Sequence, residues 1–565
     1  MDLKKYLTIK NVNKISIVLY TSSIILGILY LAIPSYNILW DVCGVVFIIT
    51  MFFSFIVIYF TSKALNKSSS IGNRLNLMCY FYPFVLSIAM LLMMFGNFLM
   101  SVTYSSAFIN NFGWYLMVYG GYFGTLVFGL CISALAVKNA LNNELWVQAW
   151  TKIGKTKKII KIVVQAFVLF MMVFGAYLAF IVIVGDRGIL GMFFPELALG
   201  FSFIFLSATI IILKTIVRKN HLVLFNALAI VGIVLASIFF LPYALTPVAI
   251  PNAETNFADA FGNDWRERIN PDVEQYFMKT QYSTPEYFLG INTDEYIVKT
   301  NIKFFDGKDS PYKIDENITL FFDVYMPKNR GIGLPGKNST LIRIHGGSWT
   351  TYDKGVSNMM EMNKYFAAQG YIVFDIQYGL HRPNRQGDWL TPENVLGDFK
   401  IDDMVRHIGI FTKYLAANAK KYGANLNSVF ISGGSAGGHL TCAVALAMAS
   451  GEFYYMFSPN LKIKGLIPFY PANVLNSSWG NLKLIRPEFM IKANSPPCLV
   501  FQGYQDGLVR WTVSQRLKDT YTANGNEKCA VIYFPLAGHA NDIYFSGHFN
   551  MVFVYYMERF MYLNR

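Results

Sequence analysis

Seven long apolar stretches without a charged residue dominate the first 245 residues of this 565-residue chain. They lie near residues 15–33, 42–60, 77–100, 114–137, 162–184, 197–213 and 222–245. A helix needs roughly 20 residues to cross the hydrocarbon core of a bilayer, and these stretches have about that length. A buried helical core does not account for so many uncharged runs. The sequence therefore predicts an all-α bundle of seven transmembrane helices over 1–245, in a multi-pass protein of the cell membrane.

Basic residues alternate between the loops that join the seven stretches. The N-terminal segment and the second, fourth and sixth loops together hold 16 Lys and Arg, whereas the fifth loop holds only Arg187 and the first and third loops hold none. Basic loops stay in the cytoplasm. The pattern predicts a cytoplasmic N-terminus, and seven spans then place everything after Leu245 outside the cytoplasm.

The charge distribution also excludes some classes of function. Residues 1–245 hold 17 basic and 5 acidic residues, while residues 246–565 hold 31 and 29. The net charge of +14 therefore lies mainly between the apolar stretches, and it predicts no nucleic-acid partner. Uncharged spans also disfavour an ion-coupled transporter. The cysteines show no metal-ligand spacing, so we expect no metal, and whether Cys498 and Cys529 pair stays open.

The composition changes abruptly after Leu245. Prolines and charged residues over 246–295 predict a linker with a membrane-proximal helical cover. From 296 onward, short β-rich runs alternate with helical patterns, which predicts a mostly parallel α/β sheet with an antiparallel edge and helices on both faces over 296–565. The expected strands are 296–305, 318–326, 340–345, 371–377, 428–432, 464–469, 498–502 and 530–534, and the expected helices are 355–368, 399–422, 436–450, 511–524 and 541–561.

The segment "GGSAG", residues 433–437, matches the pattern G-x-S-x-G. An apolar strand, "SVFIS", precedes it, and the helical pattern "HLTCAVALAMA" follows it. A nucleophile elbow needs this order, because the tight turn between strand and helix lifts the serine hydroxyl above the edge of the sheet. The pattern alone is also common in glycine-rich turns, so its context decides. The context makes Ser435 a candidate nucleophile.

Two further residues complete a candidate triad in the chain order Ser, acid, His. Asp506 follows the strand of "CLVFQGYQDGLV", and His539 follows the next strand, in "VIYFPLAGHAND". Loops at the carboxyl edge of a parallel sheet bring such side chains together. His539 would then take the proton of Ser435, while Asp506 would fix the tautomer of the imidazole.

An oxyanion loop is expected upstream, where "LIRIHGGSW" ends a strand. Gly346 and Gly347 can offer unobstructed backbone N–H groups, and the N–H of Ala436 would complete the hole. Each element also has a simpler reading, such as a turn aspartate or a loop histidine. His548 is a rival base within a helical pattern, whereas His345 and His439 belong to glycine-rich motifs. Four aromatic residues are candidates to line an acyl or sugar site: Trp349, Tyr352, Trp389 and Trp479.

Residues 296–565 resemble an α/β-hydrolase of the hormone-sensitive-lipase-like esterase group, and they are particularly similar to bacterial acetyl and carbohydrate esterases. The similar stretches are "HGGSW", "AANAKKYGANLNSVFISGGSAGGHL", "GYQDGLV" and "AGH". The resemblance implies the same nucleophile, acid, base and oxyanion donors as those named above. Ser348 departs from the HGGG of many members, and HGGSW also fits the H-G-G-x-W form of kynurenine formamidases. Ester and amide substrates therefore both stay open, and the seven-span half resembles no family that we recognise.

Together these features predict a membrane-anchored, extracytoplasmic serine esterase of the carboxylesterase type. It would form an acyl-enzyme and hydrolyse it with water, and it would need no cofactor. The expected substrate is a carboxylic ester with an acetyl or short acyl group, on a small molecule, lipid or glycan. The alternatives are a membrane-bound acyltransferase that uses the same site, and a non-enzymatic receptor or scaffold with a hydrolase-like domain.

Overall fold

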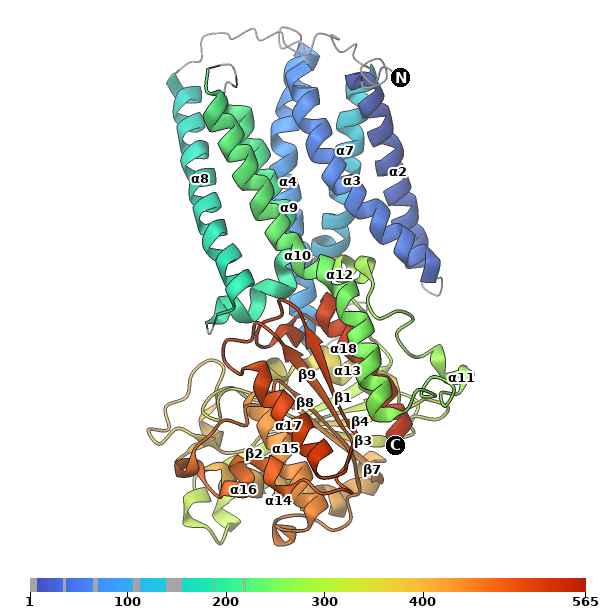
Figure 1. Cartoon of the computed structure of the whole chain (residues 1–565), viewed down its shortest axis with the longest axis vertical. Helices are drawn as coiled ribbons and strands as arrows, with labels where there is room; N and C mark the ends of the chain where they lie inside the picture. Colours follow the sequence, from blue (N-terminus) through green and yellow to red (C-terminus); the bar gives the residue numbers. More distant parts are fainter. Residues whose placement is uncertain are drawn as a thin grey trace.

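The structure is a computed structural model in which a helical bundle stands on an α/β part (Figure 1). It describes residues 8–33, 37–64, 70–104, 112–138, 155–186, 188–216, 218 and 220–565, so Arg187 lies outside the described residues. The α/β part lies at one end of the bundle, and the first helix begins at the other end.

Within the described residues, seven helical spans are long and apolar enough to cross a membrane, as the sequence predicts. Large apolar side chains are exposed along them; on the fifth span, Phe170 and Val173 are 65% and 66% exposed. Water-soluble proteins rarely expose such a surface, whereas the helices of membrane-spanning proteins do. The spans are α2 (Ile9–Ala32), α3 (Asn37–Ala64), α4 (Ser70–Ser101), the series α6 (Phe112–Tyr115), η1 (Leu116–Gly120) and α7 (Gly121–Lys138), then α8 (Lys155–Val184), α9 (Ile189–Thr215) and α10 (Leu222–Phe261).

The sixth span is longer than the uncharged window predicted over 197–213, and the additional turns bring two charged residues into α9. Both are buried against protein, since Glu196 is 1% and Lys214 is 5% exposed. The carboxylate of Glu196 accepts a hydrogen bond from the backbone N–H of Phe549 at 3.0 Å, and Lys214 donates to the carbonyl of Cys79 at 2.7 Å. Paired in this way, charged groups are tolerated in an apolar helix.

The seventh span does not end where the predicted linker begins. Helix α10 runs on to Phe261 and so includes residues 246–261, which belong to the predicted linker and helical cover. Prolines at three positions lie inside it, and each removes one backbone hydrogen bond. Ala249, Ala253 and Phe257 recur at helical spacing and pack into the core of the α/β part, which holds the helix together. Only the remainder, 262–295, is irregular, with the short helices α11 (Pro271–Glu274) and α12 (Thr284–Leu289).

All eight strands expected from the sequence are present and form one sheet of order β1-β2-β4-β3-β7-β8-β9-β10. β2 pairs antiparallel with β1 and β4, and the other neighbours are parallel, as predicted. Cys498 and Cys529 are register partners on β9 and β10, and both are free thiols. The strands are β1 (Tyr296–Asp306), β2 (Thr319–Pro327), β3 (Ser339–Ile344), β4 (Ile372–Ile376), β7 (Asn425–Gly434), β8 (Ile463–Phe469), β9 (Cys498–Gly503) and β10 (Cys529–Phe534).

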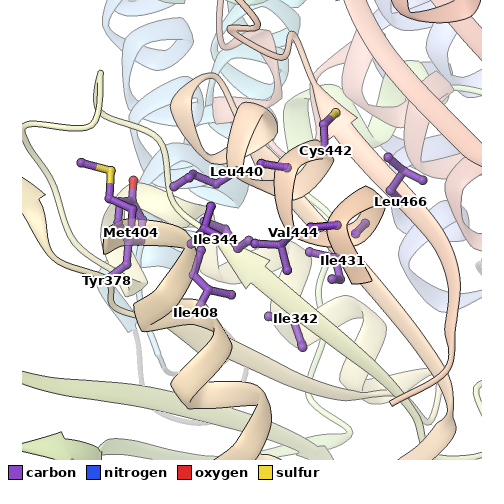
Figure 2. Close-up of a cluster of buried hydrophobic side chains, with 14 of the residues drawn as sticks. Ile342, Ile344, Tyr378, Met404, Ile408, Ile431, Leu440, Cys442, Val444 and Leu466 are labelled. Carbon is purple, nitrogen blue, oxygen red and sulfur yellow. The ribbon is translucent and has the colours of Figure 1, made fainter. Parts of the chain in front are cut away.

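Helices cover both faces of this sheet. On one face, α14 (Ile401–Tyr422), α15 (Ala436–Ser450) and α17 (Trp511–Ala523) bury an aliphatic core that includes Ile344, Ile431 and Leu440 (Figure 2). On the other face, α13 (Met360–Ala368) and α18 (His548–Asn564) pack beside α10. α18 begins at His548 rather than at 541, because residues 541–547 turn back toward the edge of the sheet that faces the bundle.

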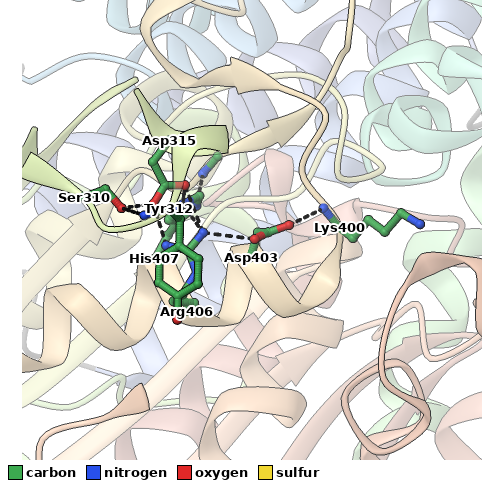
Figure 3. A network of polar contacts seen from close by, with 8 residues as sticks. Ser310, Tyr312, Asp315, Lys400, Asp403, Arg406 and His407 are labelled. Atoms are coloured by element: carbon green, nitrogen blue, oxygen red, sulfur yellow. Dashed lines mark hydrogen bonds and ion pairs between the residues drawn. The ribbon is translucent and has the colours of Figure 1, made fainter. Parts of the chain in front are cut away.

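A buried polar network fastens the connection between β1 and β2 to α14 (Figure 3). Asp315 accepts hydrogen bonds from Arg406 at 2.6 Å and from His407 at 3.0 Å. Burial opposes the ionised form of Asp315, but the bonds from His407 and Arg406 outweigh it and hold the pKa of this carboxyl below its ordinary value. The Nδ1 of His407 accepts the N–H of Gly379 at 3.1 Å, so this His–Asp pair is committed to structure.

Buried hydrogen bonds also join the α/β part to the bundle. Asn97, near the end of α4, donates to the carbonyl of Phe288 at 2.9 Å and to the hydroxyl of Tyr544 at 3.0 Å. The hydroxyl of Tyr104 donates to Asp323 on β2 at 2.7 Å. Because buried polar groups are costly to leave unpaired, these contacts fix how the two parts sit together.

Candidate active site

The three residues of the predicted triad lie within hydrogen-bonding distance of one another. The Nε2 of His539 is 2.9 Å from the Oγ of Ser435, and its Nδ1 is 2.7 Å from the Oδ2 of Asp506. Ser435 follows β7, Asp506 follows β9 and His539 follows β10, so parallel strands deliver all three side chains to one edge of the sheet.

The turn at Ser435 has the strained backbone of a tight connection between a strand and a helix. Its φ is 56° and its ψ is −117°, a conformation that costs about 1–3 kcal/mol in a non-glycine residue. The flanking glycines leave room for the turn. A Cβ added at Gly433 would lie 2.3 Å from the carbonyl oxygen of Ile344, and one added at Gly437 would lie 2.1 Å from the same atom. The "GGSAGG" sequence is therefore explained by close backbone approach.

Hydrogen bonds around Asp506 determine which ring nitrogen of His539 carries the proton. The Oδ1 of Asp506 accepts the backbone N–H groups of Leu508 at 2.9 Å and Val509 at 2.7 Å. Its Oδ2 is left to accept from the Nδ1 of His539, which places the lone pair of Nε2 toward the hydroxyl of Ser435. Such a chain can remove the serine proton as the oxygen attacks a carbonyl.

Two of the three candidate oxyanion donors, Gly346 and Ala436, lie beside Ser435. A Cβ added at Gly346 would lie 3.5 Å from the Cβ of Ser435, so this backbone passes directly beside the serine. Gly347 has a φ of 105°, which favours glycine, and Ala436 is the first residue of α15. N–H groups at a helix N-terminus point at developing negative charge, so the arrangement can stabilise an oxyanion.

The rival base His548 and the two histidines of the glycine-rich motifs, His345 and His439, contact other groups. His548 is fully buried, its Nδ1 lies 2.8 Å from the hydroxyl of Thr246, and burial lowers its pKa to about 3. His345 stacks on Tyr378 with ring centroids 4.5 Å apart, and burial lowers its pKa to about 4. The Nδ1 of His439 accepts the indole N–H of Trp349 at 3.2 Å.

The structure places the aromatic candidates for a substrate site in different surroundings. Trp349 is 7% exposed and packs against Trp479 at a centroid distance of 5.7 Å, close to the oxyanion loop. Trp389 is 90% exposed and belongs to the surface. A separate cavity of about 880 Å³, lined by Ile463 and Lys528 among others, lies at the opposite edge of the sheet, where β8 and β10 begin.

Two features of the site were not expected from the sequence. The first is Tyr470, whose ring centroid lies 4.4 Å from that of His539 and whose hydroxyl donates to Asp542 at 2.5 Å. Burial raises the pKa of the Asp542 carboxyl, although Tyr470 and Arg343 oppose this effect. Tyr470 directly follows β8, which lies between β7 and β9 in the sheet. A polar residue at the carboxyl end of this strand is the sequence signal by which Tyr470 could have been found.

The second feature is the connection between α8 and α9, which lies against the loops of Asp506 and His539. Asp186 forms a parallel β-bridge with Asp506, and the side chain of Gln505 donates to the carbonyl of Ile183 at 2.9 Å. The side-chain amide of Asn541 accepts the N–H of Gly538 at 2.6 Å and donates to the carbonyl of Met192 at 2.7 Å. The ends of two apolar helices therefore support the candidate acid and base.

Comparisons with known proteins agree on the class of the α/β part. The sequence model of the BD-FAE family matches residues 322–480. The probable carboxylic ester hydrolase LipM of Mycobacterium tuberculosis is 24% identical over 237 residues, which cover 38% of this chain and 51% of LipM. The chain thus spans about half the length of this curated relative.

Solved esterase structures are also similar to this chain. Esterase 2 of Thermogutta terrifontis, phosphonylated by cyclosarin, has 20% identity and a TM-score of 0.34, covering 43% of this chain and 85% of that one. An inhibited esterase B from Lactobacillus rhamnosis also has 20% identity and a TM-score of 0.34, covering 44% and 81%. The family match and the curated relative show an esterase-like α/β-hydrolase domain, whereas the N-terminal half is not recognised.

Proposed function

We propose that this chain, whose residues 322–480 match the sequence model of the BD-FAE family, is a membrane-anchored serine esterase that acts outside the cytoplasm. The observation that carries the proposal is the continuous hydrogen-bonded chain from Ser435 through His539 to Asp506. Its substrate class is a carboxylic ester, with an acetyl or short acyl group as the first candidates to test.

The reaction follows from the positions of these groups. His539 takes the proton of Ser435 as its Oγ bonds to the ester carbonyl carbon, and the resulting oxyanion is stabilised by the N–H groups of Gly346, Gly347 and Ala436. When the intermediate collapses, His539 gives that proton to the departing alcohol and an acyl-enzyme remains. Water then attacks the acyl group by the same route in reverse, which releases the carboxylic acid and restores the serine.

The proposed location rests on the charges of the helical part. Of the described basic residues, Lys10, Lys63 and Lys138 lie at the end of the bundle far from the α/β part, as does the N-terminal end of α8 (Figure 1). Basic residues stay on the cytoplasmic side. The hydrolase domain at the opposite end would accordingly lie outside the cytoplasm.

A membrane-impermeant fluorophosphonate on intact cells tests both proposals together. We expect labelling of the wild type and its loss in Ser435→Ala. Ser450→Ala changes a serine at the other end of the same helix and should label like the wild type. Labelling that appears only after lysis would overturn the location, and no labelling of folded protein under either condition would overturn the serine mechanism. Product analysis with an added alcohol separates hydrolysis from acyl transfer.

A further inference from the structure

The candidate catalytic centre lies at the ends of two apolar helices rather than at a distance from the bundle. Asp506 pairs with Asp186, two residues beyond the last residue of α8. The loop of His539 contacts the first turn of α9, where a Cβ added at Gly538 would lie 2.1 Å from the carbonyl oxygen of Gly191. The nucleophile is hydrogen-bonded to this loop, so the whole triad sits at this level of the bundle.

The length of α8 places that level relative to a bilayer. From Lys161, the last basic residue of its N-terminal end, to Val184 at its C-terminus, the helix rises by about 35 Å at roughly 1.5 Å per residue. The hydrocarbon core of a bilayer is about 30 Å thick, and the headgroups extend a few ångströms beyond it on each side. With the basic end at one interface, Val184 reaches the other, where ester groups of lipids lie.

Exposed apolar side chains connect the helix ends to the triad. Val184 and Ile189, on either side of the α8–α9 connection, are 56% and 68% exposed. Leu508, two residues after Asp506, is 45% exposed. Val474 is 54% exposed, two residues after Ala472, whose N–H donates to the carbonyl of Ser435 at 3.2 Å. A site for a water-soluble polar ester would gain nothing from these side chains, whereas acyl chains at an interface would cover them.

We infer that the substrate is a membrane-resident amphiphile whose carboxylic ester lies at the level of the lipid headgroups. This inference rests on the proposed esterase function and adds the substrate class to it. The hydrocarbon part stays in the leaflet beside Val184, Ile189 and Leu508, while the carbonyl reaches Ser435. Ser435 bonds to that carbonyl, the alcohol part departs with a proton from His539, and water releases the acid.

The test uses the full-length protein in vesicles of phosphatidylcholine and phosphatidylglycerol. Two esters with the same fluorogenic alcohol are compared: a water-soluble acetate and a long-chain ester dissolved in the vesicle membrane. We expect the long-chain ester to be hydrolysed with a kcat/KM at least tenfold higher. Its rate should follow its mole fraction in the membrane rather than its bulk concentration.

Matched variants locate the effect on the surface that faces the membrane. Leu508→Gln should lower kcat/KM for the long-chain ester about tenfold relative to that for the acetate, because roughly one apolar contact is lost. Ile332→Gln changes a side chain that is 81% exposed in the loop before β3, at the opposite edge of the sheet, and should leave the ratio unchanged.

The outcomes separate this inference from the proposed function. Hydrolysis of the acetate with no preference for the long-chain ester, or equal effects of Leu508→Gln on both, would overturn the inference while the esterase function stands. Failure of both esters together with absent fluorophosphonate labelling of Ser435 would overturn the function, and the inference with it.

Discussion

Replacing Gly538 by alanine is expected to slow ester hydrolysis by about 100-fold, because the base loop and the start of α9 touch through this residue. The added Cβ would lie 2.1 Å from the carbonyl oxygen of Gly191, about 1.3 Å closer than the 3.4 Å at which ordinary contact begins. The obstructing atom belongs to backbone, so the loop of His539 must move by about that distance. A misplacement of about 1 Å in a catalytic group can cost 10²-fold in rate.

The assay is kcat for a soluble acetate, measured on purified full-length protein and normalised to the folded fraction. Gly124→Ala is the matched control, since a Cβ there would meet no atom within 4 Å and the residue lies in α7. Asn541→Ala removes two hydrogen bonds of the same contact without adding bulk and should lower kcat by roughly tenfold. Wild-type kcat in folded Gly538→Ala protein would refute the claim that the bundle positions His539.

Three further predictions concern the acid, a rival base and a buried carboxyl. Asp506→Asn should lower kcat by about 10⁴-fold, because the amide no longer fixes the tautomer of His539; kcat and the rate of fluorophosphonate labelling measure this, and a small loss would contradict it. His548→Asn should lower the Tm but keep labelling of Ser435 per folded molecule, since His548 contacts Thr246 rather than the serine. Burial and the nearby Asp323 raise the pKa of Asp375 to about 7, so its contribution to stability is complete below the unfolded pKa of about 3.9 and is lost as the pH rises through 7. The Tm of Asp375→Asn should therefore fall less steeply than that of the wild type between pH 4 and 7, and parallel slopes would exclude this role.

The sheet and the order of its functional loops could be predicted because each strand is visible in a short stretch of sequence. The parallel strands are short apolar runs, and a parallel sheet delivers their carboxyl ends to one edge. Ser435, Asp506 and His539 each follow such a run, so their approach in space follows from topology alone.

The contacts with the bundle could not be predicted in this way. Asn541 and Gln505 donate to the main-chain carbonyls of Met192 and Ile183, which any residue at those positions would offer, so no side-chain pattern marks the partner. The continuation of α10 was missed because Pro247 and Pro251 are typical of helix ends. Packing of Phe257 into the α/β core outweighs that local preference, and such packing is not visible along the sequence.

Truncation separates the two ways in which the helical part supports the hydrolase. A fragment of residues 262–565 loses Ala249, Ala253 and Phe257 from the core under β9 and β10, and burial of one large apolar side chain is worth about 1.5–3 kcal/mol. We expect this fragment to aggregate, whereas 246–565 retains that helix face and should be recovered folded.

The longer fragment still lacks the α8–α9 connection, so the loops of Asp506 and His539 lose the backbone that they contact. Its Tm should approach that of the full chain, while its kcat for a soluble acetate stays well below. Soluble, fully active 262–565 would show that the bundle is only an anchor. Folded 246–565 with low kcat would instead show that helix α10 stabilises the fold and that α8 and α9 position the triad.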